Sequence, residues 1–468
     1  MVVIANSRFV SLRLRVVVVS ACYRIGFIAG FSILALFITS QHIRQETVYL
    51  SNHNADSESS VFSTNKNTGY KVNHLNTSAK LNSTYHVIKS MPNPICKEKK
   101  TNVAFLKVHK AGSTTVMNIF LRYAVGNDLN IVLPKRWQGN GFNYLGYGKT
   151  LSRKNIVPLP SNETYNILCN HVIYDKNAFD DVMPPDSTYI GIIRDPASHF
   201  ISASVYYGFY RSLKNVLFHR NKLNFKDFNA KNENVLSEFL KNPGDFRNVS
   251  TAFVRNRMSY DFGVNPLLFN NKNFIDYHLK QLDKDFKLVM IMEYFHESLI
   301  LLKRILCWEL KDILYVPLNI NSRKIDLSLS TDDLQRLKRW NYADFRLYNH
   351  FNNTFWKRVE KEGATFHEEV NHFKEVQKKV TVFCLNLDQS RFFFVEKSRW
   401  NNNFTVVRED CVFMTLKELP LIKHLIISAW GKYYSWLGYQ VKDKTSSQTT
   451  TNTAMNINLA HVPFVIQT

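Results

Sequence analysis

Short apolar runs alternate with longer stretches of helical periodicity through the middle of the chain. Five runs are continuous enough for buried strands, and they cover residues 103–108, 165–169, 189–193, 288–292 and 313–316. Three stretches repeat their apolar residues at helical spacing, and they cover residues 114–125, 294–306 and 334–356. This alternation predicts an α/β fold, in which a central parallel sheet is flanked by helices on both faces. After residue 380 the pattern predicts no definite element.

An apolar segment near the N-terminus has the features of a membrane anchor. Residues 25–39 carry no charge, and four arginines precede them. A basic N-terminal flank predicts a cytosolic tail over residues 1–24, a single transmembrane signal anchor over 25–40 and a lumenal remainder. A cleaved signal peptide shares this pattern. Both alternatives send the bulk of the chain into the secretory pathway.

Polar segments mark the limits of the predicted folded domain. Residues 41–100 are rich in Ser, Asn, Thr and Lys and show no lasting period, which is typical of a flexible stem. We therefore expect a lumenal domain over residues 101–441 and a polar tail over 442–468.

The chain is strongly basic. Sixty Lys and Arg residues outnumber 38 Asp and Glu, giving a formal net charge of +22. Such an excess indicates an anionic partner, namely a nucleic acid, an acidic membrane surface or a polyanionic substrate. The secretory route makes a nucleic acid the least expected of the three.

Cysteines and glycosylation sequons agree with a lumenal address. Five cysteines follow the expected anchor, which permits two disulfides and one remaining thiol, with the pairing left open. No CxxC pair occurs, so a zinc ribbon is not expected. Six N-x-S/T sequons occur, at Asn76, Asn82, Asn162, Asn248, Asn352 and Asn403.

The first predicted strand leads into the turn HKAGSTT, and a helix follows. Small side chains leave backbone N–H groups open to an anion, and the helix N-terminus adds partial positive charge. This is not a Walker A loop, because the lysine precedes the only glycine, so a kinase or ATPase is disfavoured. The alternative is a capped helix with an exposed lysine. The candidate anion-binding residues are Lys110, Ala111, Gly112, Ser113, Thr114 and Thr115.

A second anion-binding pair follows the third predicted strand. Arg194 ends that strand, Pro196 suits the first turn of a helix, and Ser202 lies two turns further on. The forked guanidinium of Arg194 and the hydroxyl of Ser202 are suited to a second phosphate. The alternative is an Arg–Asp surface pair with a helix-capping role.

Together, VHKAGSTT and IIRDPASHFISASVYY resemble the two nucleotide-binding motifs of sulfotransferases, and they are most similar to the galactose 3-O-sulfotransferase family, which includes galactosylceramide sulfotransferase. The stretches LCNHVIYD, EYFHESLILLKRILCWELKDILYVPLN, MSYDFG and RWNYADFRLYNHFNNTFW also look like that family. The likeness covers residues 101–360 in the same order, and extends more distantly to uronyl 2-O-sulfotransferases. It implies a P-loop-like sulfotransferase fold preceded by one transmembrane helix.

The resemblance also implies a co-substrate, 3′-phosphoadenosine 5′-phosphosulfate. Residues 110–115 would hold its 5′-phosphosulfate, while Arg194 and Ser202 would hold its 3′-phosphate. His199 stands where the family commonly has an arginine, which puts an additional phosphate contact in doubt. The basic stretch at residues 322–324 is a candidate for closing over the nucleotide. The transfer chemistry needs no metal, and no cluster of ligand residues argues for one.

In the implied reaction, Lys110 would stabilise the leaving-group oxygen. His171 would take the proton of the acceptor hydroxyl, since an unperturbed histidine pKa near 6.5 suits proton transfer. His109 is the rival for this role, and the alternative for His171 is a structural histidine. Three tryptophans are candidate sugar platforms, although core packing is the more common role for such residues: Trp308, Trp340 and Trp356.

The expected acceptor is the 3-hydroxyl of a terminal β-galactose on a glycolipid or glycoprotein. The expected location is the Golgi membrane, as a single-pass type II protein with its catalytic domain in the lumen. A Golgi glycosyltransferase is one alternative, because the triplet Asp283-Lys284-Asp285 has the D-x-D form of a nucleotide-sugar site. A non-catalytic glycan-binding protein is the other, although it would not need both Lys110 and Arg194.

Overall fold

The computed structural model describes residues 98–135, 144–146, 149–220, 234–317, 327–386 and 390–437. The chain divides into two units, 1–90 and 91–468, and all of the described residues belong to the second. The expected membrane anchor, nearly all of the stem and the polar tail lie outside them. Within the described ranges, no helix combines the length and the apolar character needed to cross a membrane.

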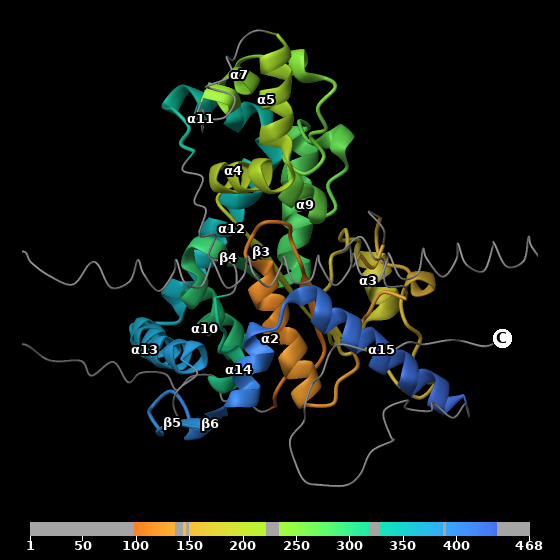
Figure 1. Ribbon diagram of the computed structural model, residues 1–468, viewed down its shortest axis with the longest axis vertical. Coiled ribbons are helices and arrows are strands. Elements are labelled where there is room, and N and C mark those ends of the chain that lie inside the picture. The colour runs from red at the N-terminus through yellow and green to blue at the C-terminus, as the bar shows by residue number, and fades with distance from the viewer. Residues whose placement is uncertain are drawn as a thin grey trace, which may run out of the picture. The chain divides into compact units, whose positions relative to one another are not determined.

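Four parallel strands form the central sheet, in the order β2-β1-β3-β4 (Figure 1). They are β1 (Val103–Leu106), β2 (Ile167–Leu168), β3 (Thr188–Ile193) and β4 (Phe286–Ile291). Every residue of β1 and β3 is buried. A parallel sheet covered on both faces has continuous apolar strands rather than alternating ones. The four corresponding sequence predictions are therefore confirmed, with shifted ends.

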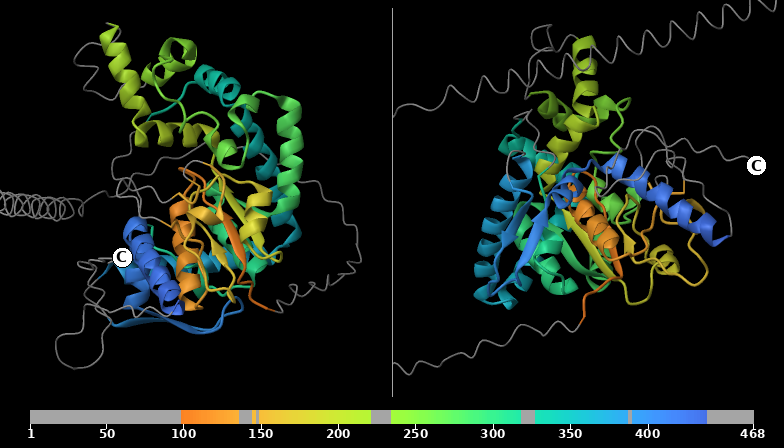
Figure 2. Two further views of the ribbon diagram at one scale, coloured as in Figure 1. Left: turned by 90° about the vertical axis from the view of Figure 1, so that its right-hand side faces the viewer. Right: turned by 60° about the horizontal axis from the view of Figure 1, so that its bottom comes forward.

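Helices cover both faces of this sheet (Figures 1 and 2). On one face lie α2 (Ser113–Gly126) and α10 (Phe295–Leu306), as predicted, and on the other lie α9 (Lys272–Asp285) and α12 (Tyr342–Lys361). Shorter helices are α3 (Lys176–Val182) and α8 (Arg257–Asp261). The α/β class is confirmed. Single 3-10 turns occur at Arg153–Asn155, Pro243–Phe246, Pro266–Leu268, Met292–Tyr294 and Lys311–Ile313.

A second group of helices has a hydrophobic cluster of its own, at the top of Figure 1. It contains α4 (Pro196–Tyr206), α5 (Phe209–His219), α7 (Asn234–Lys241) and α11 (Thr331–Trp340). Phe239 lies at its centre, with its ring edge-on to Phe209 and Trp340. Since α4 begins directly after β3, this cluster stands above the carboxyl ends of the strands.

The prediction of a fifth strand at residues 313–316 is wrong. This segment is buried, but it is a 3-10 turn followed by irregular backbone. Side chains take the place of a strand partner: the Tyr315 N–H donates to Gln377 Oε1 at 3.2 Å, and Gln377 Nε2 donates to the Tyr315 carbonyl. Arg122 donates to the neighbouring Leu314 carbonyl. Buried backbone groups need partners, and here the helices supply them.

The predicted helix over residues 334–356 is in fact two helices, α11 and α12, separated at Asn341. The Asn341 side chain is buried, and it accepts from the Asn256 N–H at 2.9 Å and donates to the Val254 carbonyl at 3.1 Å. Asparagine favours such side chain–backbone bonds over continuation of a helix. The break therefore fixes the loop that precedes α8.

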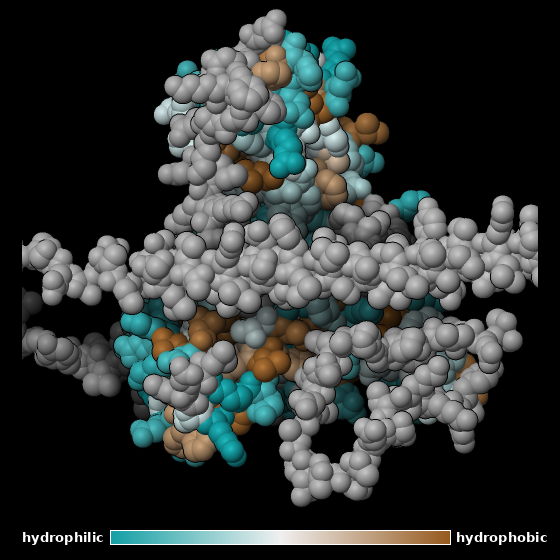
Figure 3. Space-filling view, viewed as in Figure 1, coloured by the Kyte–Doolittle hydropathy of each residue, from teal (hydrophilic) through white to brown (hydrophobic). Residues whose placement is uncertain are grey.

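The C-terminal part of the domain has a regular structure that the sequence pattern did not predict. It consists of α13 (Thr365–Leu385), the antiparallel hairpin of β5 (Phe392–Val395) and β6 (Phe404–Val407), α14 (Arg408–Thr415) and α15 (Glu418–Trp436). Tan side chains appear at the lower left of Figure 3, where Figure 1 places the hairpin. Phe392 and Phe394 of β5 are exposed. Helix α14 packs against α2. The C-terminal segment thereby reaches the first helix of the sheet domain.

Cysteines tie this segment together. A disulfide joins Cys384 at the end of α13 to Cys411 in α14. Cys307 is disulfide-bonded as well, whereas Cys169 keeps a buried free thiol. Burial raises the pKa of that thiol, so it is not a reactive nucleophile.

Candidate active site

All four strands of the sheet contribute residues to one region at their carboxyl ends. Lys107 follows β1, His171 follows β2, Arg194 follows β3 and Met292 follows β4. Strand β1 has β2, the next strand in the sequence, on one side and β3 on the other, so the direction of the strand order changes at β1. Open α/β sheets bind ligands at such a switch in strand order.

The turn between β1 and α2 has the backbone of an anion-binding loop. Lys110 (φ 54°) and Gly112 (φ 73°) are both left-handed. Turns with left-handed residues direct successive N–H groups into a concave nest, and the N-terminus of α2 adds its partial positive charge. A Cβ on Gly112 would lie 2.2 Å from Met292 Sδ, so a larger residue would displace that flexible side chain, and the left-handed backbone itself favours glycine.

The hydroxyls of the turn have different partners. Ser113 Oγ is buried and donates to the Val108 carbonyl at 2.6 Å, which closes the turn. Thr114 Oγ1 donates to Glu418 at 3.1 Å. Ala111 is buried, and the Thr115 N–H donates to the Gly112 carbonyl at 3.3 Å. An anion in this turn would therefore be bound mainly by backbone amides and lysine rather than by the Ser113 hydroxyl.

The structure brings the two sequence-predicted anion sites into contact. Arg194 Nη1 donates to the Lys110 carbonyl at 3.3 Å. The Lys110 ammonium lies 3.8 Å from the ring centre of Tyr206, which is exposed on α4. Burial, reinforced by the positive charges of Arg194 and Lys107, lowers the pKa of Lys110 to about 8. Two half-buried cations thus lie at the turn. Among the described residues, no carboxylate lies close enough to Lys110 to form an ion pair with it.

Helix α4 carries the other members of the predicted second site. The Asp195 carboxylate caps the helix by accepting from the Ser198 N–H at 2.8 Å. Ser202 lies half-buried on the same helix. His199 is fully buried, and its Nε2 donates to the His109 carbonyl at 2.9 Å. Burial lowers the pKa of His199 to about 4, so it is neutral and supports the turn from behind instead of binding an anion.

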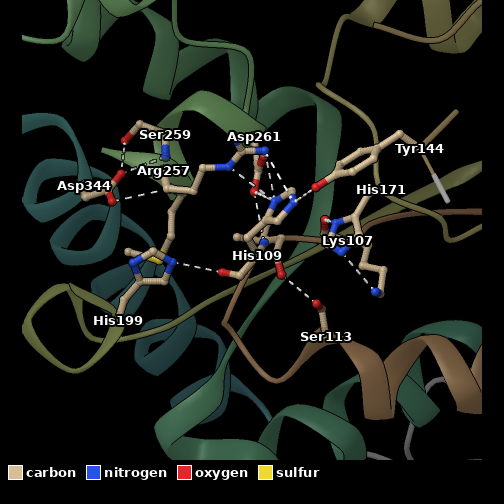
Figure 4. A network of polar contacts seen from close by, with 12 residues as sticks. Lys107, His109, Ser113, Tyr144, His171, His199, Arg257, Ser259, Asp261 and Asp344 are labelled. Carbon is tan, nitrogen blue, oxygen red and sulfur yellow. Dashed lines mark hydrogen bonds and ion pairs between the residues drawn. The ribbon is translucent and has the colours of Figure 1, made fainter. Parts of the chain in front are cut away.

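His171 is half-buried beside the turn, with both ring nitrogens directed at Lys107 (Figure 4). Nδ1 donates to the Lys107 carbonyl at 2.9 Å, which leaves Nε2 as the lone-pair nitrogen, 3.1 Å from Lys107 Nζ. Its ring stacks on His109, with 4.0 Å between centroids. Burial, and then the positive neighbours His109 and Lys107, lower the pKa of His171 well below its ordinary value, so the ring is neutral.

His109 lies deeper and has partners on both nitrogens. Nδ1 is 2.7 Å from Asp261 Oδ2, and Nε2 is 2.6 Å from the Tyr144 hydroxyl. Arg257 donates to the other oxygen of Asp261 at 2.8 Å. Burial opposes ionisation of Asp261, but His109 and Arg257 outweigh it and lower its pKa. Figure 4 shows His109 between Asp261 and Tyr144, so this histidine is held by the protein interior.

Two charged residues of this region were not singled out from the sequence. Lys107 is 2% exposed, and its Nζ lies 2.8 Å from both carboxylate oxygens of Glu418, the first residue of α15. A lysine inside the buried run VAFLKV was the available signal, because lysine is almost never fully buried without a partner. Glu418 had no such signal.

Asp261 belongs to the MSYDFG stretch, whose role the sequence did not define, and Arg257 directly precedes that stretch. They lie on α8, which is anchored to α12 by a buried carboxylate. Asp344 accepts from the Ser259 N–H and from its hydroxyl, each at 2.7 Å. Burial raises the pKa of Asp344 to about 6. This anchoring holds Asp261 against the turn.

The remaining candidates lie elsewhere. Trp308 is buried and stacks on Tyr123, with 3.7 Å between centroids, and it is therefore a core residue. Trp340 and Trp356 also pack against aromatic neighbours, which are Phe200 and Phe239 for the first and Tyr294 and Phe355 for the second. Residues 322–324 lie outside the described part of the chain.

The D-x-D triplet ends α9 and precedes β4, so it lies at the amino edge of the sheet, opposite the turn. Asp283 is 2.7 Å from His350, and Asp285 accepts from the Tyr174 hydroxyl at 2.8 Å. Over the described ranges, no three His, Cys, Asp or Glu side chains are arranged to hold a metal ion. The triplet therefore gives the glycosyltransferase alternative no support.

Comparison with known proteins connects this site to one family. The galactose-3-O-sulfotransferase family matches residues 60–392. Galactosylceramide sulfotransferase of Bos taurus is 31% identical over 293 residues, which are 62% of this chain and 65% of that protein. Galactose-3-O-sulfotransferase 2 of Sus scrofa is 32% identical over 295 residues, 61% of this chain and 69% of that protein. Galactose-3-O-sulfotransferase 3 of Mus musculus is 33% identical over 293 residues, 61% of this chain and 64% of that protein.

Proposed function

Since the chain belongs to the galactose-3-O-sulfotransferase family, we propose that it transfers a sulfuryl group from 3′-phosphoadenosine 5′-phosphosulfate to a hydroxyl of a terminal β-galactose. The observation that carries the proposal is the turn at residues 109–115, where a left-handed backbone, the start of α2 and two cations converge. The 3-hydroxyl is the proposed acceptor atom, by likeness to relatives whose names specify it.

The turn has the features needed to bind the donor. Backbone amides from Ala111 to Thr114 suit the 5′-phosphosulfate, because the start of a helix leaves its first N–H groups without partners within the helix. The left-handed glycine at position 112 carries no side chain that would obstruct an anion approaching the backbone. Arg194 and Ser202, on the far side of Lys110, suit the 3′-phosphate.

The bound donor supplies an electrophilic sulfuryl group attached to a phosphate leaving group. Lys110 would stabilise the negative charge that develops on the bridging oxygen as the S–O bond breaks. His171 would accept the proton of the galactose hydroxyl at Nε2 while the hydroxyl oxygen forms its new bond to sulfur. Burial and the neighbouring positive charges lower the pKa of His171, so Nε2 is unprotonated before transfer, but it is a weaker base than the unperturbed histidine expected from the sequence.

We further propose a glycolipid or glycoprotein glycan as the carrier of this galactose, because one of the similar proteins is named for galactosylceramide. The proposed setting is the Golgi membrane, with residues 25–40 as the single anchor and the catalytic domain in the lumen. The basic flank of that apolar segment supports this orientation.

The direct test is sulfuryl transfer by the purified protein. It would be incubated with the 35S-labelled donor and a panel of β-galactosides that contains galactosylceramide, lactosylceramide and a galactose-terminated N-glycan. Labelled galactoside is the expected product, and mapping the sulfate to C3 tests the regiochemistry. Failure to label any glycan, together with failure to bind adenosine 3′,5′-bisphosphate, would contradict the proposal.

The reaction should weaken in alkali because of Lys110. Its pKa of about 8 leaves the ammonium protonated below that pH and neutral above it. We expect kcat/KM for the donor, which reports ionisations of the free enzyme, to fall about tenfold per pH unit above pH 8. In Lys110→Arg this limb should disappear, since a guanidinium stays charged. An unchanged alkaline limb in that variant would assign it to another group.

A further inference from the structure

Helix α15 begins beyond residue 392, where the family match ends, and yet its first residue reaches the transfer site. We propose that Glu418 is a positioning residue of this site, which anchors the Lys107 ammonium so that its bond to the lone pair of His171 stays the weaker one, and which orients the Thr114 hydroxyl. This inference rests on the proposed sulfotransferase function and adds to it a residue from the C-terminal helix.

The contacts of Glu418 are specific. Oε1 and Oε2 each lie 2.8 Å from Lys107 Nζ, and Oε2 also accepts from Thr114 Oγ1 at 3.1 Å. Lys107 follows β1 and precedes the anion-binding turn, and Thr114 lies near the start of α2, at the other end of that turn. The carboxylate therefore joins both ends of the loop that is proposed to hold the phosphosulfate.

A carboxylate in this place does not serve donor binding. An acidic group beside a site for a polyanion opposes binding by like-charge repulsion, and the effect is larger when the groups are partly buried. Glu418 is ionised there, because Lys107 and Thr114 outweigh the burial that opposes its charge and lower its pKa. Its contribution must therefore lie in the arrangement of its neighbours.

His171 provides the reason for such an arrangement. Its Nδ1 donates to the Lys107 carbonyl, so the only lone pair that can take a proton is on Nε2, and Lys107 Nζ lies 3.1 Å from it. The Lys107 ammonium has three N–H donors, and it contacts both oxygens of Glu418 at 2.8 Å and His171 Nε2 at 3.1 Å at the same time. Hydrogen bonds between charged groups are the stronger ones. Glu418 therefore carries the stronger bonds of the ammonium, and the longer contact with Nε2 is the one that an acceptor hydroxyl can displace.

The first test is Glu418→Gln. With the carboxylate gone, the ammonium turns to His171 Nε2 or to the donor, so kcat should fall by about 10- to 100-fold, as expected for a misplaced catalytic group. The dissociation constant of adenosine 3′,5′-bisphosphate, measured by calorimetry, should stay equal or decrease. Glu418→Asp should recover part of kcat. Retention of wild-type kcat by Glu418→Gln would overturn the inference.

A matched control separates this role from stability. Glu369 is another buried carboxylate, paired with Lys303 at 2.8 Å on the outer side of α10. Glu369→Gln should lower the thermal midpoint without changing kcat. Equal losses of kcat in Glu369→Gln and Glu418→Gln would show that the loss reflects only stability, and would overturn the inference.

A double variant decides the case if Glu418→Gln fails to fold. Removing one partner of a buried ion pair is destabilising, whereas replacing both by apolar residues is often neutral. Lys107→Met/Glu418→Leu should therefore fold, bind adenosine 3′,5′-bisphosphate and transfer sulfate at close to the wild-type kcat, because no ammonium is left to compete for His171 Nε2. A folded double variant as slow as is expected of Glu418→Gln would overturn the inference. These outcomes differ from failure of the proposed function, in which the wild-type protein itself would neither transfer sulfate nor bind the nucleotide.

Discussion

Lys110→Ala is expected to lower kcat/KM for sulfuryl transfer by about 10³-fold, the effect typical of losing a group that stabilises charge in the transition state. Lys110 is a half-buried residue of the anion-binding turn beside Arg194, and no other described ammonium lies in this position except Lys107, which is bound to Glu418. Because burial leaves the ammonium poorly solvated, its pKa is lowered to about 8 and its charge is available to an anion.

The measurement is initial-rate transfer from the 35S-labelled donor, with the thermal midpoint recorded for each variant. Lys176→Ala is the matched control, since Lys176 forms an exposed ion pair with Asp180 on α3 and should change neither quantity. A Lys110→Ala protein with more than a tenth of wild-type kcat/KM would remove Lys110 from the transfer step.

His171→Gln has the other large expected effect, a fall in kcat of about 10²- to 10⁴-fold. Glutamine can keep the bond to the Lys107 carbonyl, but it cannot accept a proton at this pH. The dissociation constant of adenosine 3′,5′-bisphosphate should therefore change little. The split between kcat and nucleotide binding distinguishes a base from a residue that only shapes the loop.

His109→Gln is the comparison that ranks the two histidines. His109 is bonded to Asp261 and Tyr144 and lies beside Arg257, so its loss leaves a buried charge network incomplete and should lower the thermal midpoint. His171→Gln, at a position less deeply buried than His109, should be the more stable variant. A fully active His171→Gln together with a folded, inactive His109→Gln would transfer the role of base to His109.

The sequence predicted the parts of this molecule whose information is local. Buried parallel strands are continuous apolar runs, so four strands were recognisable, and the HKAGSTT turn was recognisable because small residues stood between a strand and a helix. Residues 313–316 had the same apolar character, but the bonds to their backbone come from Gln377, some sixty residues away. No local pattern contains that information.

The same reason explains which site residues were missed. Lys110 and Arg194 each stand at the end of a predicted strand, where parallel topology brings them together. Glu418 reaches Lys107 across 311 positions of sequence, and its helix follows a hairpin that showed no clear period. His199 was noticed only as a departure from the family's arginine, and its buried bond to the turn depends on how α4 packs. Contacts of this kind require the tertiary structure.

The disulfide between Cys384 and Cys411 has a practical consequence for producing the protein. It closes a loop of 27 residues that includes the β5–β6 hairpin, and α15 with Glu418 begins shortly after it. Cross-links over such loops typically contribute about 3 kcal/mol through the unfolded chain. In a reducing bacterial cytoplasm this cross-link does not persist. Recombinant material made there would lose the covalent restraint that precedes Glu418, so an expression host with an oxidising secretory route is required for meaningful kinetics.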